Sequence, residues 1–166
     1  MNKIDIKFDK TTIAKILDAE ELIEFIALNR YRSLKSLESE EFRQFPEWVK
    51  DIIFILDFET EYEMQGLLTF LVNSTGHYLP EIIHSFKRSN NNSIADLLME
   101  LQNTLSSVGL SPDILRNSKD NLSLDEYPEV SEKIKEIDDE LRGFIEEKEF
   151  WGNVTVYVQR KIDSGC

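Results

Sequence analysis

The fold of this protein is decided by the stretch PEWVKDIIFIL, residues 46–56. Pro46 suits the first turn of a helix, because the N–H group that proline lacks would have no partner there. The apolar positions that follow recur with helical spacing at Trp48, Ile52, Ile55 and Leu56. We therefore expect a helix with a buried face to begin at Pro46 and to continue towards Phe70, and we expect residues 73–76 to end it.

Helical patterns also lie on both sides of this stretch. Upstream, apolar residues predict a helix over about residues 11–30. Downstream, we expect a short helix from Pro80, an amphipathic helix over residues 93–109 and a long helix over about residues 128–149. Residues 154–158 alternate as a strand would, but a single strand has no partner in a helical chain. We therefore expect that segment to be helical as well.

These patterns predict an all-α fold, with residues 1–166 in a single domain built as an orthogonal or irregular bundle of about six to seven helices. The length suits one domain, and an apolar fraction of 41% supplies a core. Six glycines and four prolines are too few for the turns that many short strands would require. The helix over about residues 11–30 is expected to pack on a core of about residues 46–160.

The chain is strongly acidic, with 32 acidic and 19 basic residues and a net charge of −13. Such a field repels the phosphates of nucleic acids and anionic membrane surfaces, and it attracts basic proteins and cations. We therefore expect a basic protein as partner and no direct binding to nucleic acid or membrane. The alternative is that the charge only keeps the protein in solution.

The single cysteine, Cys166, stands at the end of the sequence and has no second cysteine with which to form an internal disulfide. The sequence begins without the apolar stretch of a signal peptide, and its longest apolar run is only Ile52 to Leu56. A chain with one cysteine suits a reducing compartment, and the other two features favour neither export nor membrane insertion. We therefore expect a cytoplasmic location.

Four acids and no base occupy residues 57–63. On a helix Asp57 and Glu61 are neighbours, four residues apart, and Glu59 and Glu63 form a second such pair. Each pair of like charges at this spacing costs a few tenths of a kcal/mol. Glu59 and Glu63 continue the apolar face that precedes them, so burial would require a partner or a proton. The alternative is a kink within the cluster that turns both acids to water.

A metal site has weak support. Glu81 and His84 have the E-x-x-H spacing of di-iron helix bundles, in which both side chains share one helix face. Glu59 and Glu63 could add carboxylates, but such sites need a second E-x-x-H motif, and the chain has two histidines in all. We therefore expect no metal and no other cofactor. No nucleophile motif or phosphate-binding loop occurs, so we expect a protein that is not an enzyme, with a metal–carboxylate enzyme as the alternative.

The acidic segment from Asp125 to Glu149 is the most informative. Its eleven acidic and four basic residues leave a net charge of −7, more than half of the total of −13. If it is fully helical, this segment is a rod roughly 35 Å long. Duplex DNA carries its phosphates along a comparable rod, so a fixed array of carboxylates can occupy a groove that normally holds DNA. The alternative is an ordinary solvated face, to which bases four residues from acids, such as Lys133 after Glu129, would be suited.

The residues that we predict to bind a partner are the acids expected on the surface of these two segments. They are Asp57, Glu61, Glu132, Glu136, Asp138, Asp139, Glu140, Glu146 and Glu147. Binding through them should depend strongly on salt, because exposed charges are screened within about 10 Å at 0.1 M salt.

A family pattern is matched at Gly66, Phe70, Asn73, Ser74 and Gly76. The pattern is Asn-Gly-Gly-Phe and, after five further residues, Asn-Ser-Ser-Gly. It resembles a widespread family of bacterial helical domains of unknown function that includes a DNA-mimic protein. The resemblance extends over about residues 46–160.

The chain departs from this family pattern where Met64, Gln65 and Leu67 replace the Asn, the first Gly and the Phe. A ligand-binding role of that loop is therefore not carried over. We interpret Gly66, Asn73 and Gly76 as a structural motif, in which the glycines allow a close helix approach and a chain reversal.

The resemblance implies an all-helical domain, often dimeric, without known catalysis, so a homodimer is one expected state. For the DNA-mimic member it implies an acidic surface that binds a transcription factor in place of DNA. Our leading hypothesis is a non-enzymatic interaction protein that binds a basic partner as a DNA mimic, occupying a DNA-binding protein. The alternative is an immunity or antitoxin protein that inhibits a cationic toxin.

Overall fold

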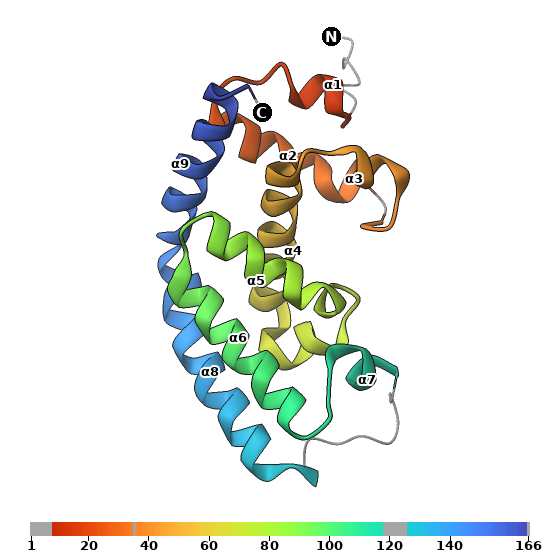
Figure 1. Ribbon diagram of the computed structural model, residues 1–166, viewed down its shortest axis with the longest axis vertical. Coiled ribbons are helices and arrows are strands. Elements are labelled where there is room, and N and C mark those ends of the chain that lie inside the picture. Colours follow the sequence, from red (N-terminus) through yellow and green to blue (C-terminus); the bar gives the residue numbers. More distant parts are fainter. Residues whose placement is uncertain (1–7, 35, 118–125, 166) are drawn as a thin grey trace.

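The prediction of an all-α fold is confirmed. The computed structural model describes residues 8–34, 36–117 and 126–165, and within them it contains nine α-helices, one short 3-10 helix and no strand (Figure 1). This is more than the six to seven helices expected, because some of the predicted helices are divided and short ones lie between them. The helices are α1 (Lys10–Ile13), α2 (Ala19–Ser33), α3 (Glu40–Gln44), α4 (Glu47–Val72), η1 (Thr75–Tyr78), α5 (Leu79–Arg88), α6 (Asn92–Ser107), α7 (Pro112–Asn117), α8 (Pro128–Glu147) and α9 (Phe150–Asp163).

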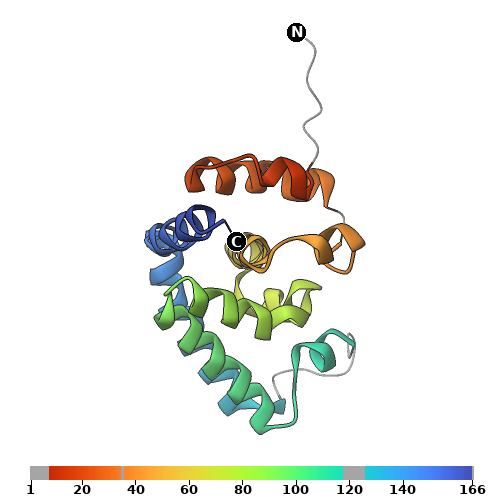
Figure 2. The same ribbon diagram turned by 45° about the horizontal axis from the view of Figure 1, so that its top comes forward.

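Helix α4 lies at the centre of the molecule. Figure 2 shows it nearly end-on, with α1 and α2 on one side and α5 on the opposite side. It contacts α2, α5, α7, α8 and α9, and every residue from 51 to 59 is buried. The buried helix predicted from Pro46 is therefore confirmed, with Pro46 as the residue just before its first turn. Although α4 has 26 residues, none of the helices in the described part of the chain is both long and apolar enough to cross a membrane.

Aromatic rings connect α4 to the helices around it. The ring of Phe58 packs edge-on against those of Phe70 and Phe86, at centroid distances of 5.0 and 5.6 Å. Phe86 of α5 in turn contacts Phe150 at the start of α9. Edge-to-face pairs of this kind are favoured over stacked rings by the quadrupole of the π-system. One chain of rings therefore joins the middle and the C-terminal part of α4 to α5 and α9.

Two buried aspartates of α4 fix how its neighbours are aligned. Asp51 is 1% exposed and accepts hydrogen bonds from Ser85 and Arg88 of α5 and from the hydroxyl of Tyr157 of α9. Asp57 is bound by Arg30 of α2. Because a buried carboxylate is costly without donors, each aspartate fixes the position of the helix that supplies them.

Gly66 and Gly76 both have backbone roles, as predicted, but the two roles are exchanged: Gly66 was expected to allow close helix approach and Gly76 a chain reversal. Gly66 bends α4, with φ 77° and ψ −179°, a region nearly closed to other residues, and a Cβ there would meet nothing within 4 Å. Gly76 has no positive φ, and a Cβ on it would lie 2.5 Å from the carbonyl oxygen of Phe70 and 2.7 Å from that of Leu71. The bend thus follows the acidic cluster, and Gly76 is the site of close approach.

Two predicted helix boundaries are wrong. The helix expected over residues 11–30 is divided, because Asp18 caps a new helix by accepting a hydrogen bond from the backbone of Glu21. The long helix expected to reach about residue 149 ends at Glu147, because Lys148, which follows it, has a left-handed conformation with φ 54°. Helix α9 follows directly, so the helical prediction for residues 154–158 is confirmed, and α9 packs on α2.

We predict that replacing Gly76 with alanine lowers the free energy of unfolding by about 1–3 kcal/mol, because the new Cβ must push two backbone carbonyls apart. Urea denaturation measures this change. Gly143→Ala is the matched control: a Cβ at this exposed helical position meets nothing, so stability should rise by up to about 1 kcal/mol. A Gly76→Ala variant as stable as the unaltered protein would contradict the close approach.

Candidate protein-binding surface

Helix α8 is held to the bundle through one face. Its buried residues are Val130, Ile134, Ile137, Leu141 and Ile145. They recur every three or four residues, as in a helix that packs along its whole length, and they face α6 and α4. The predicted inner stripe is confirmed at these positions, whereas Phe144, which was also expected there, is 41% exposed. In Figure 1 α8 and α9 run along one side of the molecule.

The opposite side of α8 carries seven exposed acidic residues and no basic one. At 3.6 residues per turn, these acids fall within about a third of the helix circumference. We call them the acidic face; its members are Glu129, Glu132, Glu136, Asp139, Glu140, Glu146 and Glu147. Six of the seven were predicted as surface acids, and Glu129 was not among them.

The density of charge on the acidic face is close to that of a DNA strand. From Glu129 to Glu147 the helix rises about 27 Å, which gives one carboxylate per about 4.5 Å of helix axis. One strand of duplex DNA carries one phosphate per about 3.4 Å. The carboxylates are also held on a helix whose other side is packed, so their spacing is largely fixed.

The bases of α8 lie at the edges of the acidic face. Lys133 forms ion pairs with Glu100 of α6 at 2.8 Å and with Glu136 at 3.1 Å, and these hydrogen bonds raise the pKa of its ammonium group. Arg142 pairs with Asp138 at 3.3 Å. The predicted pattern of bases interleaved with acids therefore occurs, but on the flanks of the helix.

Asp138 is a less suitable contact residue than predicted, because it faces α4. Its carboxylate is 23% exposed and pairs with Arg142, and its backbone carbonyl accepts a hydrogen bond from the hydroxyl of Tyr62 at 2.9 Å. Its side chain binds Arg142 of the same helix, its backbone carbonyl connects α8 to α4, and Asp138 does not extend the acidic face. Asp125, at the start of the predicted acidic segment, and Cys166 lie outside the described residues.

The prediction that Asp57 lies on the binding surface is wrong. Its side chain is 3% exposed, and both oxygens are bound by Arg30, whose Nε and Nη2 donate at 3.1 and 2.7 Å. Burial raises the pKa of the Asp57 carboxyl, while the hydrogen bonds and charge of Arg30 act in the opposite direction. The sequence contained no signal for this pair, because Arg30 stands 27 residues away on another helix.

Glu61 is half-buried and binds within the chain. Its carboxylate accepts a hydrogen bond from the hydroxyl of Thr75, and its second oxygen, Oε2, is buried without a hydrogen-bond partner among the described residues. Burial raises the pKa of Glu61, and hydrogen bonds from Thr75 and Asn73 oppose this. Thr75 thus holds Glu61 to the loop that follows α4, which makes Glu61 an anchor of that loop.

Glu59 and Glu63 meet the expectation that a buried acid needs a partner. Glu59 is 8% exposed, and it accepts a hydrogen bond from the indole N–H of Trp151 at 3.1 Å. Lys148 lies 3.4 Å from Glu59 and 2.9 Å from Glu63, which is itself exposed. Lys148 was not predicted as the partner of these acids; its left-handed conformation between α8 and α9 brings it to them.

The four weak metal candidates are not brought together. Glu59 and Glu63 face Lys148, whereas Glu81 and His84 are exposed on α5. Among the residues that the structure describes, no group of three or more His, Cys, Asp or Glu side chains is placed to hold a metal ion.

The class of protein that these features define is an all-helical domain with one strongly acidic helix face. Residues 43–161 match the model of the family described as DMP19-like protein, and the chain belongs to this family. The match covers more than two thirds of the chain and confirms the resemblance that the sequence carries between residues 46 and 160. No curated protein and no solved structure is significantly similar to the chain.

We predict that Arg30→Met lowers the free energy of unfolding by about 3–5 kcal/mol at pH 7, because it leaves the Asp57 carboxylate buried without its partner. The loss should shrink as the pH falls towards 5. Without Arg30, burial holds the pKa of Asp57 above its unfolded value of about 3.9. The folded protein therefore takes up a proton at a higher pH than the unfolded chain does. Because this proton removes the buried charge, the free energy of unfolding rises as the pH falls through the raised pKa.

Urea denaturation at pH 5, 6 and 7 tests this prediction. The double variant Arg30→Met/Asp57→Asn is the control, since it has no carboxylate at residue 57 and should lose the additional pH dependence. A loss of stability in Arg30→Met that is the same at all three pH values would contradict the buried ion pair as described.

Proposed function

We propose that this protein is a non-catalytic binding protein whose acidic face binds a basic surface of another protein in the place that DNA would take. The observation that carries the proposal is the acidic face itself: seven exposed carboxylates on one side of a packed helix, without a base among them. Membership of the DMP19-like family supports a protein of the DNA-mimic type.

The packing of α8 makes the acidic face suitable for this role. Five buried side chains spread over sixteen residues, from Val130 to Ile145, hold the helix against its neighbours. A partner that binds DNA presents lysines and arginines at positions set by the phosphates. A carboxylate array that is already ordered loses less conformational entropy when it meets those positions than a flexible acidic tail would.

Electrostatics also supports the proposal. The net charge of −13 repels DNA and attracts basic surfaces, so it speeds the encounter with a cationic partner. Asp57 contributes nothing to this surface, because Arg30 neutralises it in the interior. The attraction should therefore come mainly from exposed acids, and it should weaken as salt screens them.

We predict that the variant Glu132→Gln/Glu136→Gln/Asp139→Asn/Glu140→Gln binds the partner at least about tenfold more weakly at 0.1 M salt, because it removes the central four charges of the acidic face. The partner is captured from an extract of the native host on immobilised protein and is identified by mass spectrometry. The affinity of the purified partner is then measured at two salt concentrations and in competition with duplex DNA.

The matched control is Glu20→Gln/Glu24→Gln/Glu41→Gln/Glu81→Gln. It removes the same number of charges from exposed positions on α2, α3 and α5 and should bind almost as well as the unaltered protein. The proposal requires that duplex DNA competes for the partner. The proposal would be refuted if DNA does not compete for the partner, or if both variants weaken binding equally. Capture of a toxin whose binding is not affected by DNA would favour the immunity alternative.

A further inference from the structure

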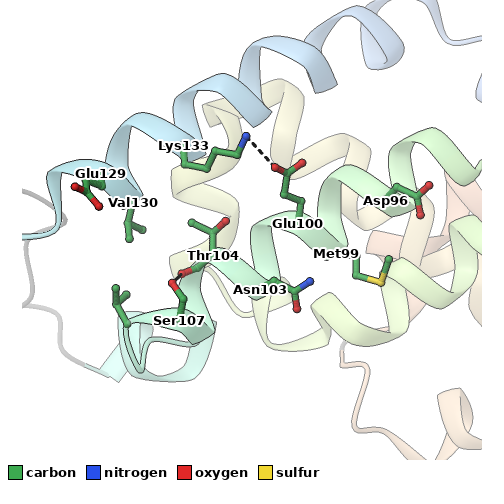
Figure 3. A pocket seen from close by; sticks show the side chains of 10 residues that line it. Asp96, Met99, Glu100, Asn103, Thr104, Ser107, Glu129, Val130 and Lys133 are labelled. Carbon is green, nitrogen blue, oxygen red and sulfur yellow. Dashed lines mark hydrogen bonds and ion pairs between the residues drawn. The ribbon is translucent and has the colours of Figure 1, made fainter.

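An open groove of about 590 Å³ lies between α6 and α8, beside the acidic face. Figure 3 shows it from close by, with Val130 of α8 and Thr104 of α6 on facing sides. We call it the α6–α8 groove. Met99 of α6 and Val108, the residue that follows α6, add apolar surface to its wall. More of the exposed wall surface is apolar than polar, although polar side chains such as Asn103 and Ser107 also line it.

The ends of the groove are acidic. Glu129, a member of the acidic face, and Asp96 of α6 lie at opposite ends of the view in Figure 3. Both are exposed, and neither forms an ion pair with another residue of the part of the chain that the structure describes. Between them, Glu100 is bound to Lys133 at 2.8 Å. The groove therefore combines apolar surface with two carboxylates that form no ion pair among the described residues.

We propose that the α6–α8 groove holds an amphipathic helical segment of the basic partner. Apolar side chains of that segment pack against Met99, Val108 and Val130, and its lysines or arginines pair with Asp96 and Glu129. This inference rests on the proposed function and adds to it an apolar anchor, which a phosphate backbone does not offer. The partner then differs from other basic proteins in having apolar side chains between the basic residues of the bound segment.

The shape of the groove favours a helix as its occupant. Its wall along α6 extends from Asp96 to Ser107, which is about 17 Å or three turns of helix. Both walls are formed by side chains of helices, and the described residues include no strand. An extended segment would therefore leave its backbone N–H and C=O groups without partners along this wall, whereas a helix satisfies its own.

The apolar anchor and the acidic face respond differently to salt. Pairing of exposed charges is screened as salt rises, whereas burial of apolar surface is not weakened by it. A partner held by charge alone is therefore released at high salt. A partner whose apolar side chains enter the groove retains part of its affinity there.

The test uses a labelled 14-residue peptide of leucine and lysine, with the leucines at helical spacing. A second peptide has the same composition but an order that breaks the spacing. We predict that the first binds at least about tenfold more tightly in fluorescence anisotropy, because only its leucines form one apolar stripe. It should also retain measurable binding at 0.5 M salt, and its addition should shift the backbone amide resonances of residues 96–108 and 129–133.

Thr104→Trp is the decisive variant, because it fills the groove without a change of charge. It should weaken binding of the first peptide at least about tenfold. Ser106→Trp adds the same side chain to an exposed position of α6 outside the groove and should change binding less than about twofold. Urea denaturation of both variants shows whether each keeps its fold.

Equal affinity for the two peptides, or equal binding by the two tryptophan variants, would overturn the groove proposal. If Thr104→Trp unfolds, Asp96→Asn/Glu129→Gln replaces it, and tight binding of the first peptide unaffected by this change would be contrary evidence. The host capture assay separates the two proposals. If capture depends on the acidic face but not on Thr104, the proposed function is supported and the groove proposal is contradicted. If capture depends on neither, both proposals are contradicted.

Discussion

The structure depends on how one fully surrounded helix satisfies its own carboxylates. Helix α4 is buried from residue 51 to residue 59, so Asp51 and Asp57 cannot reach water. Arg88 of α5 neutralises the first and Arg30 of α2 the second, with further donors from α5 and α9. Because an unpaired buried charge costs several kcal/mol, these pairs restrict the relative positions of four helices. The aromatic contacts of Phe58 then fill the space that this arrangement leaves.

The same constraint explains where the surplus negative charge lies. The deeply buried aspartates of α4 are matched by arginines, and Glu59 is matched by Lys148 and Trp151. The excess of acids is thus left mainly to exposed positions, and α8 presents seven of them on one face. The buried acids pair with donors that hold the helices together, and the exposed acids produce the electrostatic field outside the protein. The total charge of −13 therefore does not by itself describe a binding surface.

A surface of this kind has two properties that a flexible acidic tail lacks. The packed inner side of α8 fixes the spacing of the carboxylates, and the neighbouring α6 supplies an apolar groove within reach of the same partner. In the complex that we propose, charge brings the basic partner to the surface at a rate that depends on salt, and apolar packing selects among basic partners. Both proposals follow from the way in which α8 packs against α4 and α6 with one face and leaves the other exposed.

The sequence by itself determined the helical class and most of the long helices, the buried face that begins at Pro46, the inner stripe of α8 and most of the acidic face. Helical periodicity and capping are local properties of neighbouring residues, so they can be recognised without the tertiary structure. Only the tertiary structure decided that Asp57 is paired with Arg30, that Gly66 bends α4 while Gly76 allows close approach, and that a groove lies between α6 and α8. These features are set by contacts between residues far apart in the chain. A sequence pattern indicates which face of a helix is apolar. Packing decides which polar groups of other helices contact that face.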